Sequence, residues 1–385
     1  KGIMHAIREK QEIEEIIEEL ICILKQNKER FDFAAKQQIK VWKGEIPEKQ
    51  PLLLNCSLDK IQEEKIPLFN NKEIHYDSKK MLLSGLRETL AVVNAKAEAV
   101  PSVRANMGCG IFPTLLGVTQ MLFDDKMPWV IEHLSKDTLK RMSPEDIKIS
   151  DEFKIGLDHM AYMAEMLEGT GCMIFPMDLQ GAYDTAHIVY GDQIFYDMYD
   201  DPEFVHHLLE LSCEAIFIGM EECLKIIPGS DEKIAHYNSL VIPREKGGIK
   251  ISEDTPTLLS KSQIDEFVVP YMRKILEHFG GGYIHYCGKN PNLFEAVMNE
   301  PFAFGINFGN PEMHDMEYVL GKCAELDKIY YGYINKEDGM PYEEYFRKYL
   351  TASRKGRISF MFLQYTCDKD NREEVMNAWS EAIKI

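Results

Sequence analysis

GGGYIHYCGKNP, residues 280–291, is the stretch on which the interpretation of the whole chain depends. Its apolar centre predicts a short β-strand, and the glycines before it end the preceding helix. The strand closes with His285 and Cys287, two residues apart. Side chains two apart on a strand point to the same face of a sheet. The pair therefore either offers two ligands to one metal ion or simply packs side by side.

Seven further short apolar runs alternate with helix-like segments along the chain. The eight runs are 52–56, 101–106, 172–178, 248–254, 282–287, 303–308, 329–334 and 358–363. Alternating strands and helices predict a parallel sheet, and eight repeats predict a (β/α)8 TIM barrel of the α/β class. No Pro- or Gly-rich linker divides the sequence, so we expect residues 1–385 to form a single barrel domain.

Residues 1–45 precede the first predicted strand and are expected to form an N-terminal helical extension. Between positions 10 and 30, apolar residues recur with helical spacing: Ile13, Ile16, Ile17, Leu20, Ile23 and Leu24. This spacing predicts an amphipathic helix with a charged outer face. We expect its apolar face to pack on the body of the protein. The alternative is a contact with a partner helix or with a second copy in a homodimer.

The composition excludes several classes of partner. The 385 residues include 63 acidic and 44 basic side chains, for a net charge of −19. Such a surface argues against nucleic acid, whose phosphates require Lys and Arg, and against anionic membranes. No apolar run is long enough to span a bilayer, and the N-terminus lacks the apolar core of a signal peptide. Nine scattered cysteines do not resemble a disulfide framework, so we expect thiols in a reducing cytoplasm.

Polar residues gather where the predicted strands end. Catalytic groups of TIM barrels lie at the carboxyl ends of the strands. Asp178 ends the third run and Asp254 the fourth, which makes both candidates for orienting a substrate or supporting a metal ligand. Other polar residues in this position are explained equally well by contact with water, or are weaker pocket candidates: Asn106, Asn307, Asn335, Tyr183 and His187.

His285, Cys287 and Cys367 form the sharpest combination. Cys367 follows the last predicted strand, so all three would lie at one barrel mouth. Three N and S ligands with an open fourth position are typical of a catalytic Zn²⁺ site. Water, Asp178 or Glu253 is expected in the fourth position. Cys323 competes as third ligand, but it lies in a helix-like segment that should face away from the mouth.

Several common site motifs are absent from the sequence. There is no phosphate-binding P-loop and no dinucleotide fingerprint after a strand. There is also no G-x-S-x-G nucleophile elbow. A cobalamin-type D-x-H-x-x-G motif is missing as well, so this chain is not expected to carry a corrinoid itself.

Three segments taken together resemble the uroporphyrinogen decarboxylase superfamily of (β/α)8 barrels. They are QGAYDTAHIVYGDQIFYDMYDDPEFVHHLLEL at 180–211, ISEDTPTLLSKSQIDEFVVPYMRKI at 251–275 and GGYIHYCGKNPNLFEAVMNEPFAFGINFGNPE at 281–312. The resemblance covers residues 30 to 385. One branch of this superfamily is a metal-free decarboxylase with an R-Q-A-G-R signature for porphyrinogen carboxylates. Here the corresponding region reads KIQEEKIPLFNN, and Arg104 and Arg244 are the only easy substitutes.

The other branch, the cobalamin-dependent methyltransferases, fits the residues better. The resemblance implies that His285, Cys287 and Cys367 bind zinc, and that the barrel docks a separate corrinoid protein. It further implies transfer of a methyl group between a small donor or acceptor and that corrinoid. We place O-demethylation, in an anaerobe, ahead of thiol methylation. The apolar candidates for the pocket lining are Met107, Phe175, Met177, Tyr183, Phe308 and Tyr333. The alternatives are the metal-free decarboxylase and a non-catalytic ligand-binding barrel.

Overall fold

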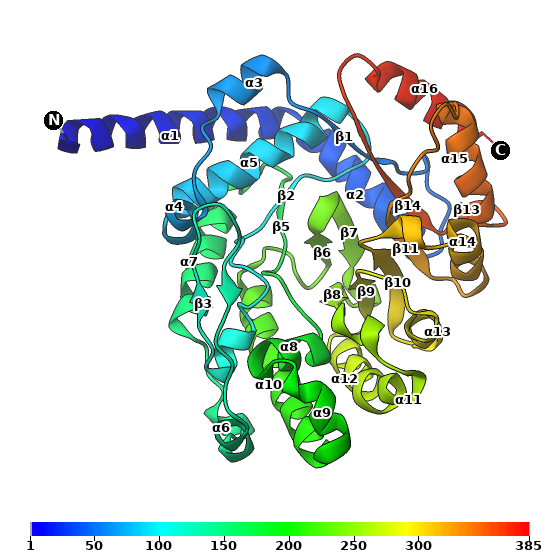
Figure 1. The fold of residues 1–385 in the computed structure, drawn as a ribbon. Helices are drawn as coiled ribbons and strands as arrows, with labels where there is room; N and C mark the ends of the chain where they lie inside the picture. Colours follow the sequence, from blue (N-terminus) through cyan, green and yellow to red (C-terminus); the bar gives the residue numbers. More distant parts are fainter. Residues whose placement is uncertain (1, 385) are drawn as a thin grey trace.

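The computed structural model describes residues 2–384, with the side chains of 9–237 and 239–384, and shows a mixed α/β fold. A six-stranded parallel sheet lies at its centre (Figure 1). In spatial order the strands are β1 (Leu53–Cys56), β14 (Met361–Cys367), β11 (Ile329–Tyr333), β10 (Ala303–Phe308), β9 (Gly282–Tyr286) and β8 (Ile249–Ser252). Their carboxyl ends therefore meet at one edge, which positions the candidate site.

Two more parallel strands continue the pattern outside this sheet. β2 (Ser102–Val103) pairs with β5 (Met173–Ile174), and a parallel bridge joins Gln180, after β5, to Ser252 at the end of β8. Seven of the eight predicted runs thus contain one parallel strand, and the eighth overlaps the start of β14. The arrangement is compatible with a TIM barrel, whose closure stays a prediction.

The last predicted run, 358–363, differs from the observed strands. β13 (Ile358–Ser359) pairs antiparallel with β12 (Arg354–Lys355), and the parallel strand β14 starts only at Met361 and continues to Cys367. The break falls at Phe360, whose N–H donates to the carbonyl of Ser353. Two antiparallel hairpins were also not predicted. They are β3 (Gln120–Met121) with β4 (Trp129–Val130), and β6 (Lys233–His236) with β7 (Leu240–Pro243).

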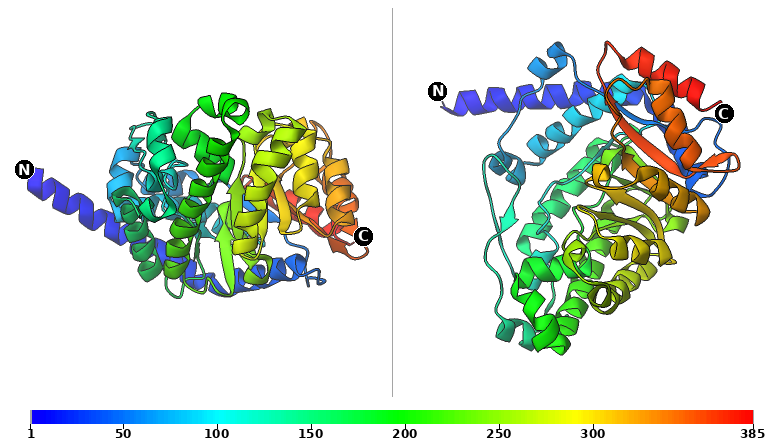
Figure 2. Two further views of the ribbon diagram at one scale, coloured as in Figure 1. Left: turned by 90° about the horizontal axis from the view of Figure 1, so that it is seen from below. Right: turned by 45° about the vertical axis from the view of Figure 1, so that its right-hand side comes forward.

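Helices surround the strands in all views (Figures 1 and 2). The first eight are α1 (Gly2–Gln26), α2 (Lys28–Trp42), α3 (Lys60–Lys65), α4 (Asn71–Tyr76), α5 (Ser78–Ala95), α6 (Lys136–Arg141), α7 (Asp151–Met166) and α8 (Ala182–Tyr190). The others are α9 (Gln193–Asp200), α10 (Pro202–Ile226), α11 (Lys261–Gln263), α12 (Val269–His278), α13 (Pro291–Asn299), α14 (Met316–Glu325), α15 (Tyr342–Ala352) and α16 (Arg372–Ala382).

Helix α1 packs on the body of the protein through the predicted apolar face. Ile13, Ile17, Leu20 and Leu24 are buried, and the helix runs against α5. Figure 2 shows its N-terminal part projecting beyond the rest of the chain. The division into one domain with an extension at 1–45 stays a prediction.

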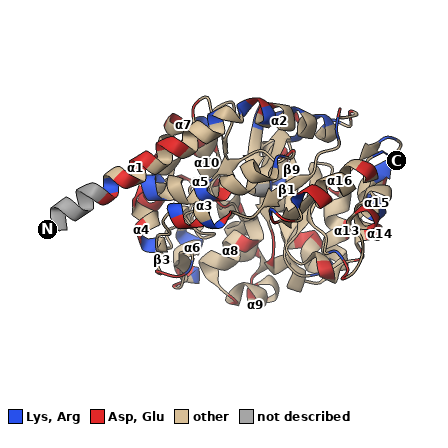
Figure 3. Cartoon of the chain, turned by 90° about the horizontal axis from the view of Figure 1, so that it is seen from above, with Lys and Arg blue, Asp and Glu red and all other residues tan. Residues whose placement is uncertain are grey.

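Acidic and basic residues are both scattered over the outer helices (Figure 3). Within residues 2–384, none of the helices combines the length and the apolar character that crossing a membrane requires.

Candidate active site

A cavity of about 1160 Å³ opens at the carboxyl ends of the strands. Its wall includes Ser252, His285, Asn307 and Tyr331 from four neighbouring strands, β8 to β11. The ladder places Ser252 opposite His285, and His285 opposite Asn307. Directly opposed residues of parallel strands share a face, so one row of the sheet supplies this wall.

His285 is held in one tautomer by its neighbour on β10. Its Nδ1 lies 2.5 Å from Oδ1 of Asn307, whose Nδ2 donates to the carbonyl of Tyr331. Because that donation fixes the orientation of the amide, Oδ1 must accept, and Nδ1 must carry the proton. Nε2 is then unprotonated, with a lone pair that can accept from the Cys287 thiol, and this is the form that binds metals. Burial lowers the pKa of His285, and the charge of Lys250 lowers it further, so the ring is neutral.

A glycine makes room for this amide. Gly332 of β11 has a φ of +146°, and a Cβ there would lie 2.5 Å from Nδ2 of Asn307. A larger residue at this position would therefore displace the side chain that orients His285.

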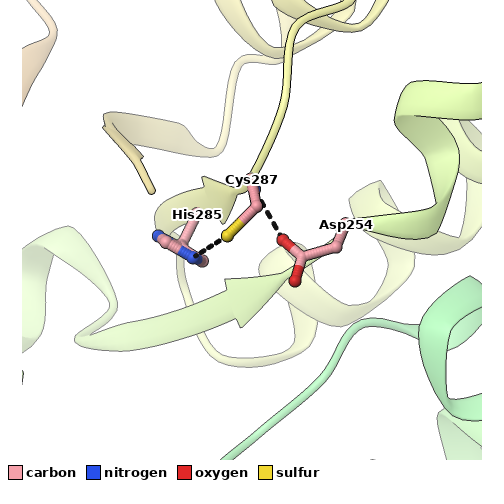
Figure 4. A group of neighbouring side chains, drawn as sticks. All are labelled: Asp254, His285 and Cys287. Carbon is pink, nitrogen blue, oxygen red and sulfur yellow. Dashed lines mark hydrogen bonds between the residues drawn. The ribbon is translucent and has the colours of Figure 1, made fainter. Parts of the chain in front are cut away.

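Cys287 and Asp254 complete a group of three side chains that point toward one another (Figure 4). The thiol Sγ lies 3.7 Å from Nε2 of His285, and the Cys287 N–H donates to Oδ1 of Asp254 at 2.6 Å. A Cβ on Gly309 would come within 2.3 Å of Sγ, so the thiol occupies the space that this glycine leaves. Burial and the nearby Asp254 carboxylate raise the pKa of Cys287 to about 11.

The donor set of this group fits zinc. One potential ligand atom from each of Asp254, His285 and Cys287 lies within 4.8 Å of the others. With the usual Zn–S and Zn–N bond lengths, a tetrahedral site separates the two atoms by about 3.6 Å. The observed 3.7 Å between Sγ and Nε2 matches that separation. Nitrogen, sulfur and carboxylate oxygen are all zinc ligands in proteins.

Two buried carboxyl groups, those of Asp184 and Glu253, fix the backbone around Asp254 through hydrogen bonds. Asp184 accepts hydrogen bonds from the N–H groups of Asp254 and Thr255, at 2.8 and 2.9 Å. In return, Glu253 accepts from the N–H groups of Tyr183 and Asp184 at the start of α8. Each acid therefore caps the segment that carries the other. Burial raises the pKa of Asp184 to about 6 and that of Glu253 well above its usual range.

Asp178 lies in another part of the same cavity, between two cations. Its Oδ1 is 3.2 Å from Nζ of Lys250 and 3.8 Å from Nη1 of Arg104. Burial alone would raise its pKa, but Lys250 and Arg104 outweigh that effect and hold the pKa at about 2. Asp178 is therefore ionised at neutral pH. Its position at the end of a predicted strand made it a candidate for orienting a substrate, and its role in catalysis stays a prediction.

The structure does not bring Cys367 into the group of Asp254, His285 and Cys287. Gln364 of β14 lines the cavity, and Cys367, three residues further on, has the opposite facing in the pleat. It is 3% exposed and lies opposite Cys56 of β1. Burial and contact with Cys56 raise its pKa to about 12. Metal binding by Cys367 stays a prediction, and it would require the end of β14 to turn over.

The other named residues divide between the cavity and the core. His187, Phe308 and Tyr333 line the cavity. Tyr183, Met107 and Met177 are buried, and Cys323 is buried in α14. Arg104 lines the cavity, whereas Arg244 donates to the carbonyl of Gly247 instead.

Lys250 and Gln364 are cavity residues that sequence reasoning missed. A signal for Lys250 was present, because a lysine inside the apolar run GIKIS shares its facing with Ser252 and Asp254. For Gln364, a glutamine amid MFLQY was the corresponding signal.

Comparisons with known proteins identify a fold. No protein-family model matches the chain, and neither does any curated protein sequence. Among solved structures, a methyltransferase from Methanosarcina mazei superimposes with a TM-score of 0.60 at 13% identity, over 90% of this chain and 98% of the other. At this identity the likeness concerns the fold alone. In its fold, the chain is similar to that methyltransferase over nearly its whole length.

Proposed function

We propose that the protein is a zinc-dependent methyltransferase that works with a separate corrinoid protein. The group of Asp254, His285 and Cys287, of which Asp254 and His285 line the cavity, carries the proposal, because its spacing and donor types suit zinc. The fold shared with a methyltransferase supports it. So does the resemblance of three segments to the uroporphyrinogen decarboxylase superfamily, within which the spacing of His285 and Cys287 favours the corrinoid-dependent branch.

The residues around the proposed metal position have separate roles in this proposal. His285 presents the Nε2 lone pair, and Asn307 keeps that nitrogen free of a proton. Asp254 fixes the backbone of Cys287 and keeps its second carboxylate oxygen for the metal. Zinc bound there would act as a Lewis acid that activates a methoxyl oxygen or lowers the pKa of a substrate thiol. Asp178, ionised and directed by Lys250, would orient the substrate.

The substrate would be a small methylated compound or a thiol acceptor, with O-demethylation ahead of thiol methylation. The rim of the cavity offers a surface for the corrinoid partner. Trp129 and Ile131 line the cavity and are still 53% and 51% exposed. Large apolar side chains exposed at a site opening are typical of protein contacts.

The metal-free decarboxylase receives less support. It needs several arginines at the cavity to bind a polycarboxylate. Of the two arginines considered from the sequence, Arg104 lines the cavity, and Arg244 is engaged with the carbonyl of Gly247.

The first experiment measures zinc per chain in anaerobically purified protein, beside the His285→Ala variant. About one zinc in the wild type and none in the variant would support the site. The loaded protein is then mixed with a corrinoid protein reduced to Co(I) and a panel of methoxylated donors, and methyl-cobalt formation is followed by absorbance. Zinc binding without methyl transfer from any donor, or to any thiol from methyl-cobalt, would contradict the methyltransferase assignment.

A further inference from the structure

Gln364 carries an unpaired hydrogen-bond donor in the cavity wall. Its side chain is 1% exposed, but Nε2 has no hydrogen-bond partner among the described residues. A buried amide donor without a partner destabilises the folded protein. Groups of this kind in native structures call for an explanation, and a bound ligand is one of the few available. Since Gln364 lines the cavity, the missing acceptor would come from whatever the cavity binds.

Two cations from other strands line the same cavity. Lys250 donates to Oδ1 of Asp178 and to Oγ of Ser252, which leaves one of its three donors. Arg104 donates to Asn106, while Asp178 lies at 3.8 Å, beyond hydrogen-bond distance. The two cations share one carboxylate, and among the described residues each retains N–H groups without an acceptor. A second carboxylate could therefore pair with both.

Aromatic rings form much of the remaining lining. Tyr237, Tyr283 and Tyr331 line the cavity, and the rings of Tyr283 and Tyr331 meet edge to face at 5.6 Å. Arg104 lies over the ring of Tyr237 at 5.8 Å, which keeps the guanidinium in place. Flat apolar ligands pack well against such walls.

We propose that Gln364, Arg104 and Lys250 form a subsite for the carboxylate of an aromatic acid, whose ring packs against these tyrosines. This subsite rests on the proposed function only in that its ligand would be the methyl donor or acceptor. The three residues come from β14, β8 and the segment after β2, and all three line the one cavity. Gln364 supplies a neutral donor, and the two cations supply charge-assisted hydrogen bonds.

The test measures binding to the metal-free full-length protein by calorimetry, with benzoate and 4-methoxybenzoate as probes. Their amides, benzamide and 4-methoxybenzamide, keep the ring and remove the charge. We expect the acids to bind and the amides to bind at least roughly tenfold more weakly, since hydrogen bonds to charged groups are the stronger kind. Equal affinity for acids and amides, or no binding of either acid at millimolar concentration, would overturn the proposal.

A pair of substitutions separates a ligand-binding role from a structural one. Gln364→Met keeps the size of the side chain and removes the unpaired donor, so we expect the Tm of the free protein to rise by about 1–2 °C while benzoate binding weakens. Gln38 is the matched control, because its buried amide donates to the carbonyls of Glu98 and Ser239 and accepts from Val241. Gln38→Met should lower the Tm and leave benzoate affinity unchanged.

Two results would contradict the assignment of Gln364. One is a fall in Tm of Gln364→Met like that of Gln38→Met, and the other is unchanged benzoate affinity. Because neither zinc nor a corrinoid is present, the outcome is independent of methyl transfer. Acid binding without methyl transfer would refute the proposed function alone, and methyl transfer without acid binding would refute the subsite alone.

Discussion

The carboxyl ends of β9 and β14 each bring a cysteine to the same edge of the sheet, but the two cysteines have opposite surroundings. At the end of β9, Cys287 shares its facing with His285 and approaches it to 3.7 Å. At the end of β14, Gln364 faces the cavity, and Cys367 lies opposite Cys56, away from it. In the sequence, both cysteines follow an apolar run that predicts a strand, so both were expected at the site. Only the pleat, in which an odd number of residues reverses the facing, separates them.

Zinc content of single variants tests the contrast between the two cysteines most directly. We expect His285→Ala and Cys287→Ser to lose stoichiometric zinc, because each removes a ligand atom of the compact group. Cys367→Ser should keep about one zinc per chain. Metal analysis after anaerobic gel filtration gives the result, and circular dichroism confirms that each variant is folded. Loss of zinc from Cys367→Ser would show that the end of β14 turns toward the site when metal binds.

Removing the side chain that orients His285 should have the next largest effect. Asn307→Ala leaves Nδ1 without its acceptor, so the ring can take either tautomer and rotate. We expect zinc affinity to fall roughly 10- to 100-fold, the usual cost of losing such a supporting contact. Competition with a chromophoric chelator measures the change.

Asn335→Ala is the matched control for Asn307, since Asn335 is also an asparagine after a strand but is exposed. Its zinc affinity should equal that of the wild type. Gly332→Ala should reproduce part of the Asn307 effect, because the added methyl group would press on the amide. If Asn307→Ala kept full affinity, His285 would not depend on this hydrogen bond.

The pH dependence of zinc binding counts the thiols that take part. The pKa of Cys287 is about 11, so at pH 7 its thiol must release a proton when it binds metal. His285 has a lowered pKa and is already neutral, so it releases none. Zinc affinity should therefore rise about tenfold per pH unit between pH 7 and 8. With the pKa of Cys367 at about 12, its participation would add a second proton and a hundredfold rise per unit.

The contrast between Cys287 and Cys367 also shows which features of the fold and the site can be predicted from the sequence. Parallel strands buried on both sides are apolar along their whole length, so all eight runs could be found. His285 and Cys287 could be paired because they belong to one strand and lie two residues apart, which is independent of where the strand begins. The facing of Cys367 depends on the register of β14 against β1. The predicted strand ended at Leu363, whereas β14 extends to Cys367.

Side-chain contacts between strands could not be predicted either, because they depend on how the strands pair. Asn307 was named only as one of several polar strand ends, and nothing local shows that the ladder sets it opposite His285. Asp254 was assigned to substrate orientation or ligand support, and its closeness to Cys287 arises from the packing of β8 beside β9. Gln364 and Lys250 each interrupt an apolar run, but which face of a strand lines the cavity depends on how the strands pack, so that signal could not be assigned to the site.

The smallest effect that we expect concerns stability and tests the two cysteines once more. Cys367→Ala removes the sulfur of a residue that is 3% exposed and lies opposite Cys56, which should lower the free energy of unfolding by about 1–2 kcal/mol. Cys287 is exposed, so Cys287→Ala in the metal-free protein should change it by less than about 0.5 kcal/mol. Urea unfolding under reducing conditions, without zinc, measures both. If Cys287→Ala cost more than Cys367→Ala, the described contrast in burial between the two cysteines would be wrong.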